Sequence, residues 1–199
     1  MTAQFGAHEV MEMHEVLTSA IDGINQLQLY RPHAKDPQLR QIIDNHMQFM
    51  MNEYNGMVQA LNQRGMAQAV PYRAPGNFSP TYGLDNPAPQ TPNANMNQLD
   101  DRDVSSGMLG CCKASTMFKT MAALECADPG LRRMLQQGAV NCSEMGYEIW
   151  QYMNQRGFYQ VPTMKEMTTN TVINSYGQAT MVPMQNTANM NMMNPRPYM

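Results

Sequence analysis

The residues best suited to chemistry gather near the start of the chain. His8, Glu9, Glu12, His14 and Glu15 place two imidazoles and three carboxylates within eight positions. Both groups bind transition metals, and helical bundles use them to hold iron or manganese. The cluster is therefore a candidate for half of a metal site. The alternative, which we favour, is a solvated helix start with one buried His–Glu hydrogen bond, because a helix N-terminus stabilises carboxylates in any case.

The other half of such a site is incomplete in the sequence. A di-metal bundle takes an inward carboxylate from two helices and a Glu-x-x-His pair from each of the other two. His46 has Ile43 three positions before it, and the last long helical segment contains no His. Counting back from the expected hairpin turn places His14 level with Glu53. We therefore expect no bound metal and no cofactor, with Glu12, His14, His46 and Glu53 as the weak candidates.

Cysteine is the other reactive residue type in the chain. Cys111, Cys112, Cys126 and Cys142 all lie in the second half, without CxxC spacing. Reduced core thiols are the reading we favour, because free Cys is among the most buried residues. We expect Cys111 and Cys142 to be inward neighbours. Cys112 and Cys126 lie nearer the edge of the helical stripe and are the candidates for cross-links between subunits.

No catalytic signature accompanies these residues. The sequence has no G-x-S-x-G elbow and no glycine-rich phosphate loop, and no His shares the second half with the cysteines. We therefore do not expect an enzyme.

The elements that carry these residues come from an internal duplication. Asp36 to Gly65 begins DPQLR and ends NQRG, and Asp128 to Gly157 begins DPGLR and ends NQRG. In each copy the aspartate suits an N-cap, the proline suits the first helical position, and the glycine suits the residue after the helix. Each copy is therefore predicted to be one long helix.

Apolar residues recur at steps of three and four along four segments, which is typical of amphipathic helices. The expected helices are residues 7–31, 37–64, 100–127 and 129–156. Asp100 and Asp103 predict an N-cap with an acidic partner at the third position of the third helix. On the fourth, Trp150 is expected to be buried, whereas Glu144 and Glu148 lie off the apolar stripe.

The segments between and after these helices differ in composition. Residues 66–98 contain six of the thirteen prolines and read as an extended connector, with Tyr72, Phe78 and Tyr82 available to pin it to the bundle. Residues 163–199 are rich in Asn and Met and are expected to be a disordered or surface-adhering tail. Hairpins 1–65 and 99–162 would pack as one all-α, ferritin-like four-helix bundle with a long crossover.

Composition narrows the classes of partner. The net charge of −3 gives no electrostatic case for nucleic acid or an anionic membrane. No apolar run is long enough to span a membrane, and the first residues do not resemble a secretory signal. Only 15% of residues are charged, so the surface is poorly protected against self-association.

Three stretches resemble the coat F domain of the spore coat protein F family. They are DRDVSSGMLGCCKAST, AALECADPGLRRMLQQ and GYEIWQYMNQRGFYQVP, within about residues 99–162. The first half, with HEVMEMHEVL, DPQLR and LNQRG, is similar to the N-terminal hairpin of the same proteins. The resemblance implies a ferritin-like bundle that is a structural component of the endospore coat, synthesised in the mother cell cytoplasm. No catalytic residues come with it.

Three functions remain open from the sequence. The first is a structural coat protein whose partners are other spore coat proteins or further copies of itself. The second is a ferritin-like metalloprotein that uses His8, Glu12, His14, His46 and Glu53 for iron or manganese. The third is an adaptor that recruits another coat protein through the Pro-rich connector.

Overall fold

Four long helices make up the first of two units in the computed structural model, which describes residues 5–63 and 69–179. The units are Met1–Pro162 and Thr163–Met199. The helices of the first are α1 (Ala7–Tyr30), α2 (Pro37–Gln63), α3 (Asp101–Glu125) and α4 (Pro129–Gln155), with single 3₁₀ turns at Arg31–His33 and Met96–Gln98. The predicted all-α fold is confirmed: within the described residues, extended pairing is limited to isolated bridges of Tyr82 and Gly83 with Val161.

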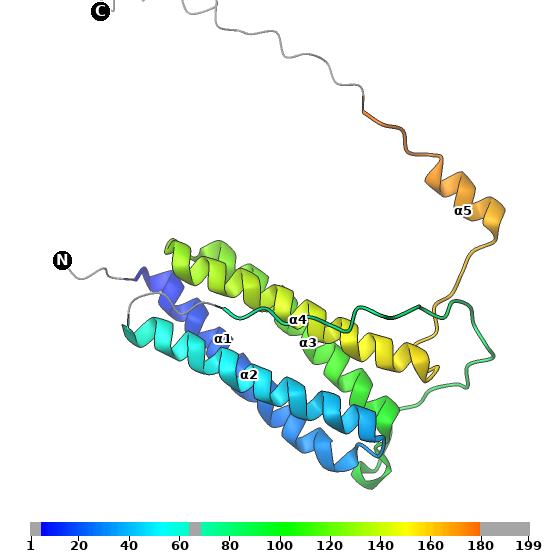
Figure 1. Ribbon diagram of the computed structural model, residues 1–199, viewed down its shortest axis with the longest axis horizontal. Helices are drawn as coiled ribbons and strands as arrows, with labels where there is room; N and C mark the ends of the chain where they lie inside the picture. The colour runs from blue at the N-terminus through cyan, green and yellow to red at the C-terminus, as the bar shows by residue number, and fades with distance from the viewer. Residues whose placement is uncertain (1–4, 64–68, 180–199) are drawn as a thin grey trace, which may run out of the picture. The chain divides into compact units, whose positions relative to one another are not determined.

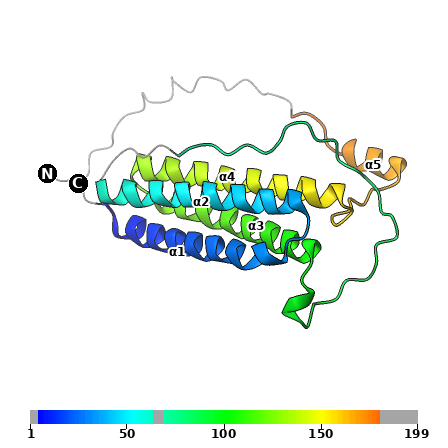
Figure 2. The ribbon, with the colours of Figure 1, turned by 60° about the horizontal axis from the view of Figure 1, so that its bottom comes forward.

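The helices form two antiparallel hairpins packed side by side (Figures 1 and 2). Besides the pairs within each hairpin, α1 contacts α3 and α2 contacts α4. Because α2 and α3 run in the same direction, the connector must travel the length of the bundle, and it does so along α4 (Figure 2). One long crossover of this kind is compatible with the ferritin-like assignment, which stays a prediction, as does the finer division at residues 65, 98 and 162.

The predicted N-cap aspartates and the glycine after α4 take the roles expected of them at the helix ends. The Asp100 carboxylate accepts hydrogen bonds from the backbone N–H groups of Arg102 and Asp103, and the Asp103 carboxylate accepts from the Asp100 N–H at 3.2 Å. At the start of α4, Asp128 accepts from the N–H groups two and three residues ahead, both at 2.8 Å. Gly157 ends α4 with φ of 68°, a left-handed conformation that favours glycine. The matching stop, Gly65, lies outside the described residues.

Acidic side chains join the hairpins at the end where α2 begins. Asp36 accepts from the N–H of Gln38 at 2.8 Å and forms an ion pair with Arg156 at the end of α4, also 2.8 Å. Asp101, at the start of α3, accepts from the backbone N–H of Lys35 at 2.6 Å. The duplicated cap and stop residues therefore also connect the two copies in space.

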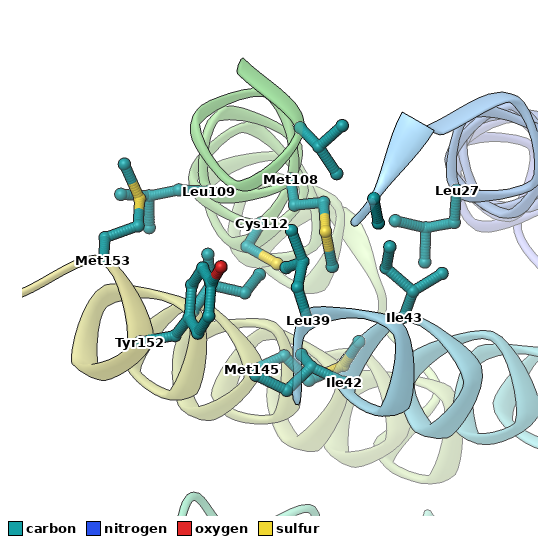
Figure 3. Packing of buried hydrophobic residues seen from close by; sticks show 13 residues of the cluster. Leu27, Leu39, Ile42, Ile43, Met108, Leu109, Cys112, Met145, Tyr152 and Met153 are labelled. Carbon is teal, nitrogen blue, oxygen red and sulfur yellow. The ribbon is translucent and has the colours of Figure 1, made fainter. Parts of the chain in front are cut away.

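The apolar core consists of two clusters and contains many thioethers and thiols. Its larger cluster is shown in Figure 3, where Met108 and Cys112 of α3 lie close to Leu39 and Ile43 of α2. Trp150, which we expected to be buried, is only partly so, and it stacks on Tyr147 at 5.6 Å. The aromatic that fills the core here is instead Tyr152, at 1% exposure.

The second unit was described too simply from the sequence. A short helix, α5 (Glu166–Ile173), lies in the segment that we expected to have no periodic structure. Its apolar residues Met167, Val172 and Ile173 are exposed. Eight residues offer too little apolar surface and too few helical turns for the sequence pattern to have shown it.

Candidate functional site

Charged and polar side chains are buried at the middle of the bundle. We call them the polar core, and they come from α2, α3, α4 and the connector. Its members are His46, Glu53, Tyr72, Lys119, Asn141 and Glu148. Within the described residues, every buried side-chain nitrogen and oxygen has a hydrogen-bond partner. Such satisfaction is what makes burial of these groups tolerable.

One part of the polar core is a triad formed by His46, Glu148 and Tyr72. His46 is 1% exposed, and its Nε2 lies 2.8 Å from the Glu148 carboxylate. The Tyr72 hydroxyl donates to the same carboxylate oxygen. Burial raises the pKa of Glu148, but the hydrogen bonds from His46 and Tyr72 outweigh it and hold the pKa below its usual value. Burial and the neighbouring carboxylate raise the pKa of Tyr72, so it remains a phenol that donates.

The other part is a buried ion pair between Glu53 of α2 and Lys119 of α3. Their side chains are 11% and 8% exposed. The second Glu53 oxygen accepts from the Asn141 amide at 2.9 Å. Burial lowers the pKa of Lys119, but Cys142 and Glu53 raise it by more, so the ammonium stays charged. A Cβ at position 138 would lie 3.0 Å from the lysine Cδ, so Gly138 provides the space for this side chain.

Amides on α4 hold the connector against the bundle. Asn141 is fully buried and bonds the backbone on both sides of Pro71, accepting from the Tyr72 N–H at 2.9 Å and donating to the Val70 carbonyl at 3.0 Å. Gln151 donates to the carbonyl of Pro75 at 3.0 Å, and Asn154 pairs with both backbone groups of Thr81. These amides replace the hydrogen bonds that an extended segment lacks.

The thiols surround a small cavity beside the ion pair. Its volume is about 30 Å³, and Cys111, Cys112 and Cys142 line it. All four cysteines are free, and Cys111 is the only one of them that is partly exposed. The expectation that Cys112 and Cys126 lie nearer the edge of the helical stripe than Cys111 is wrong: both are buried, at 9% and 7% exposure, whereas their cross-linking stays a prediction. A cross-link through either would require local opening of the bundle.

The reason for this error is the position of α3. A single apolar stripe suits a helix with one partner, but α3 packs on both α1 and α4. Its buried arc is therefore broad and includes Ser105, Leu109, Cys112 and Ala123, which lie beside the predicted stripe.

The four weak metal candidates do not come together. His14 is exposed and Glu12 partly so, whereas His46 and Glu53 are buried and bound to Glu148 and to Lys119. At the start of α1 the buried carboxylate is instead Glu9, which accepts from the N–H groups of Gly6 and Asp128. The favoured alternative of a His–Glu hydrogen bond in this cluster is therefore also wrong, because the partners of Glu9 are backbone groups.

Sequence reasoning missed Lys119, Asn141 and Glu148. Glu148 lies beside the apolar stripe of α4, and that stripe predicts only the face packed on other helices. The face of α4 that binds the connector could not be predicted from it. The duplication gave no signal for these residues, because it aligns Asn141 with Phe49 and Glu148 with Gly56. Chemically, the polar core is a set of donors and acceptors whose buried atoms each have at least one hydrogen-bond partner. Burial raises the pKa of Cys142, so it is a neutral thiol and a poor nucleophile.

Comparison with known proteins gives consistent results. The family model described as the Coat F domain matches residues 100–162. The chain is 32% identical over 176 residues to the spore coat protein F-like protein YhcQ of Bacillus subtilis (strain 168), covering 87% of this chain and 81% of the relative. A crystal structure of a candidate spore coat protein from Bacillus halodurans C-125 shares the fold, with a TM-score of 0.60 at 16% identity, over 82% of this chain and 97% of that one.

Proposed function

Because the chain belongs to the coat F family of spore coat proteins, we propose that it is a structural component of the endospore coat that assembles through protein–protein contacts. Its place is the spore coat. Synthesis in the mother cell cytoplasm, as the family implies, is part of the proposal. None of the helices in residues 5–63 and 69–179 is long and apolar enough to cross a membrane.

The observation that carries the assembly proposal is the outer face of α3. Met117, Met121 and Leu124 are 71%, 61% and 68% exposed, on one side of the helix. With Gly110 and Ala114 they follow the alternating steps of four and three that two paired helices bury between them. Adjacent large apolar residues of this kind mark interaction surfaces more often than single ones do.

The distribution of sizes along this face favours a second copy of the chain as the partner. The large residues lie toward the C-terminal end of α3, and the small residues Ser106, Gly110 and Ala114 lie toward the N-terminal end. An antiparallel pair of α3 helices related by a two-fold axis would place each large side chain against a small one. Lys113 is the one charged residue among the exposed positions from 106 to 124, so little repulsion opposes the pairing.

A structural role without catalysis is part of the proposal, and the polar core supports it. The polar core has its donors and acceptors occupied by one another, and the connector covers it. Its groups therefore stabilise the bundle and bind the crossover. The other partners in the proposal are further coat proteins, which would contact the surface of this bundle in a layered assembly.

Introducing charge on the α3 face tests the proposed contact. We expect purified protein to self-associate, and the double variant Met117→Glu, Met121→Glu to be monomeric in sedimentation velocity, because two carboxylates would be desolvated against a second copy. Stability should change by less than about 0.5 kcal/mol, since both side chains are exposed.

The control is Leu29→Glu, which places one carboxylate at a residue of similar exposure, 72%, on α1. It should leave self-association unchanged. A monomeric wild-type protein, or a double variant that associates like the wild type, would contradict an α3–α3 contact. Binding of the monomer to other coat proteins through this face would identify them as its occupants instead.

A further inference from the structure

Sulfur-bearing side chains are concentrated in the wall of the cavity at the centre of the bundle. The cavity is bounded by all four long helices, and its volume of about 30 Å³ suits one water or one ion. Six of the lining side chains carry sulfur: Met50, Met108, Cys111, Cys112, Cys142 and Met145. Three of the four cysteines of the chain thus line the same cavity.

Contacts and the shared cavity bring these groups together. A Cβ built on Gly23 would lie 3.0 Å from the Met50 methyl carbon and 3.4 Å from the Cys111 sulfur, so the two side chains approach the same point. Cys142 of α4 lines the same cavity as Met50 and Cys111.

The ligand set selects the kind of ion. Within the described residues, no three His, Cys, Asp or Glu side chains are arranged to hold a metal. Zn²⁺ takes four such ligands and is therefore disfavoured. Thiolates and thioethers are the ligands that Cu(I) prefers, and Cu(I) accepts fewer of them than Zn²⁺ requires.

We propose that this cavity binds one Cu(I) ion through the thiolates of Cys111 and Cys142, with the thioether of Met50 as a third ligand. These residues are distinct from the iron or manganese candidates of the sequence. The binding step is Cu⁺ plus two thiols giving a copper dithiolate with charge −1 and two released protons. It needs no oxidant, because copper enters in its reduced state.

The surroundings favour this chemistry. The Lys119 side chain lines the same cavity as Cys111 and Cys142. Its ammonium is therefore placed to compensate the negative charge of the complex. Cys111 is partly exposed and gives the ion a route from solvent, whereas Cys142 is buried at 8% exposure.

Competition for Cu(I) tests the site directly. Purified full-length protein would be titrated without oxygen into Cu(I) held by the coloured chelator bathocuproine disulfonate. We expect one equivalent of copper to be withdrawn. Cys111→Ser and Cys142→Ser should each weaken binding by more than about 100-fold, which exceeds the 10–100-fold typical of an outer-shell partner. Cys126→Ser removes the cysteine outside the cavity and is the matched control; it should bind as the wild type does.

Met50→Leu conserves the side-chain volume and should therefore leave the fold intact. It should weaken copper binding by about 10-fold, because it removes the thioether ligand. The proposal is overturned if the chelator retains its copper, if Cys126→Ser loses as much affinity as Cys142→Ser, or if Zn²⁺ binds with the same stoichiometry and the same dependence on Cys111 and Cys142.

Discussion

Replacing Lys119 by Met should lower the free energy of unfolding by about 3–5 kcal/mol, because the substitution leaves the Glu53 carboxylate buried without its counter-charge. The two side chains are 8% and 11% exposed, so water can solvate the carboxylate only poorly. Asn141 would remain as one hydrogen-bond donor, which is too little for an ionised group. Urea unfolding followed by far-UV circular dichroism measures the loss.

The matched control removes both charges. Glu53→Gln combined with Lys119→Met should recover most of the lost stability, because the amide still bonds Asn141 and no charge stays unpaired. A single and a double variant that are equally destabilised would mean that lost packing, rather than an unpaired charge, causes the effect.

The same pair gives a pH dependence with a definite sign. The pKa of Lys119 is raised above its ordinary value of 10.5 in the folded state. Its contribution to stability is therefore fully present below pH 10.5 and is lost as the pH rises through the folded pKa. The stability difference between wild type and Lys119→Met should accordingly shrink as the pH rises through the folded pKa of Lys119.

Truncation of Tyr152 to Ala should cost about 3–5 kcal/mol, the range for a fully buried aromatic. Tyr152 is 1% exposed, its ring lies edge-on to Phe158 at 6.2 Å, and its hydroxyl donates to Asp36 at 3.2 Å. The variant therefore loses core packing and one link between α4 and the start of α2. Thermal and urea unfolding should both report the change.

Tyr147 is the control for this truncation, since it is the same residue type on the same helix and is 44% exposed. Its stacking on Trp150 makes a cost of about 0.5–1.5 kcal/mol reasonable for Tyr147→Ala. Equal losses of stability for the two variants would contradict the orientation of α4, in which Tyr152 faces the core and Tyr147 faces the solvent.

The helices could be predicted because their signals are local. Asp128 satisfies N–H groups two and three residues away, and Gly157 takes a backbone conformation that depends on its own lack of a side chain. The fold class followed from these punctuation residues and from the duplication. A periodic pattern predicts which face of a helix is buried. It does not predict how deeply a residue at the edge of that face is buried, and Trp150 is such a residue.

The candidate site could not be predicted, because its contacts join residues far apart in the chain. Tyr72 reaches Glu148 and Asn141 across about 70 positions, and the partner of Lys119 is 66 positions earlier. The sequence around Asn141 gives no sign that its amide binds the backbone of an extended segment. His14 was placed inward by periodicity alone, whereas Met13 and Val16 fill that face of α1.

The central claim, that the chain is a structural component of the spore coat, is tested most directly by fractionating purified spores. An antibody against the full chain should detect it in the coat fraction, solubilised by hot detergent, at a level far above that in the decoated core. A mother cell cytoplasmic protein serves as the control for carry-over. Detection only in the decoated core or only in the mother cell lysate, with none in the coat fraction, would contradict the account.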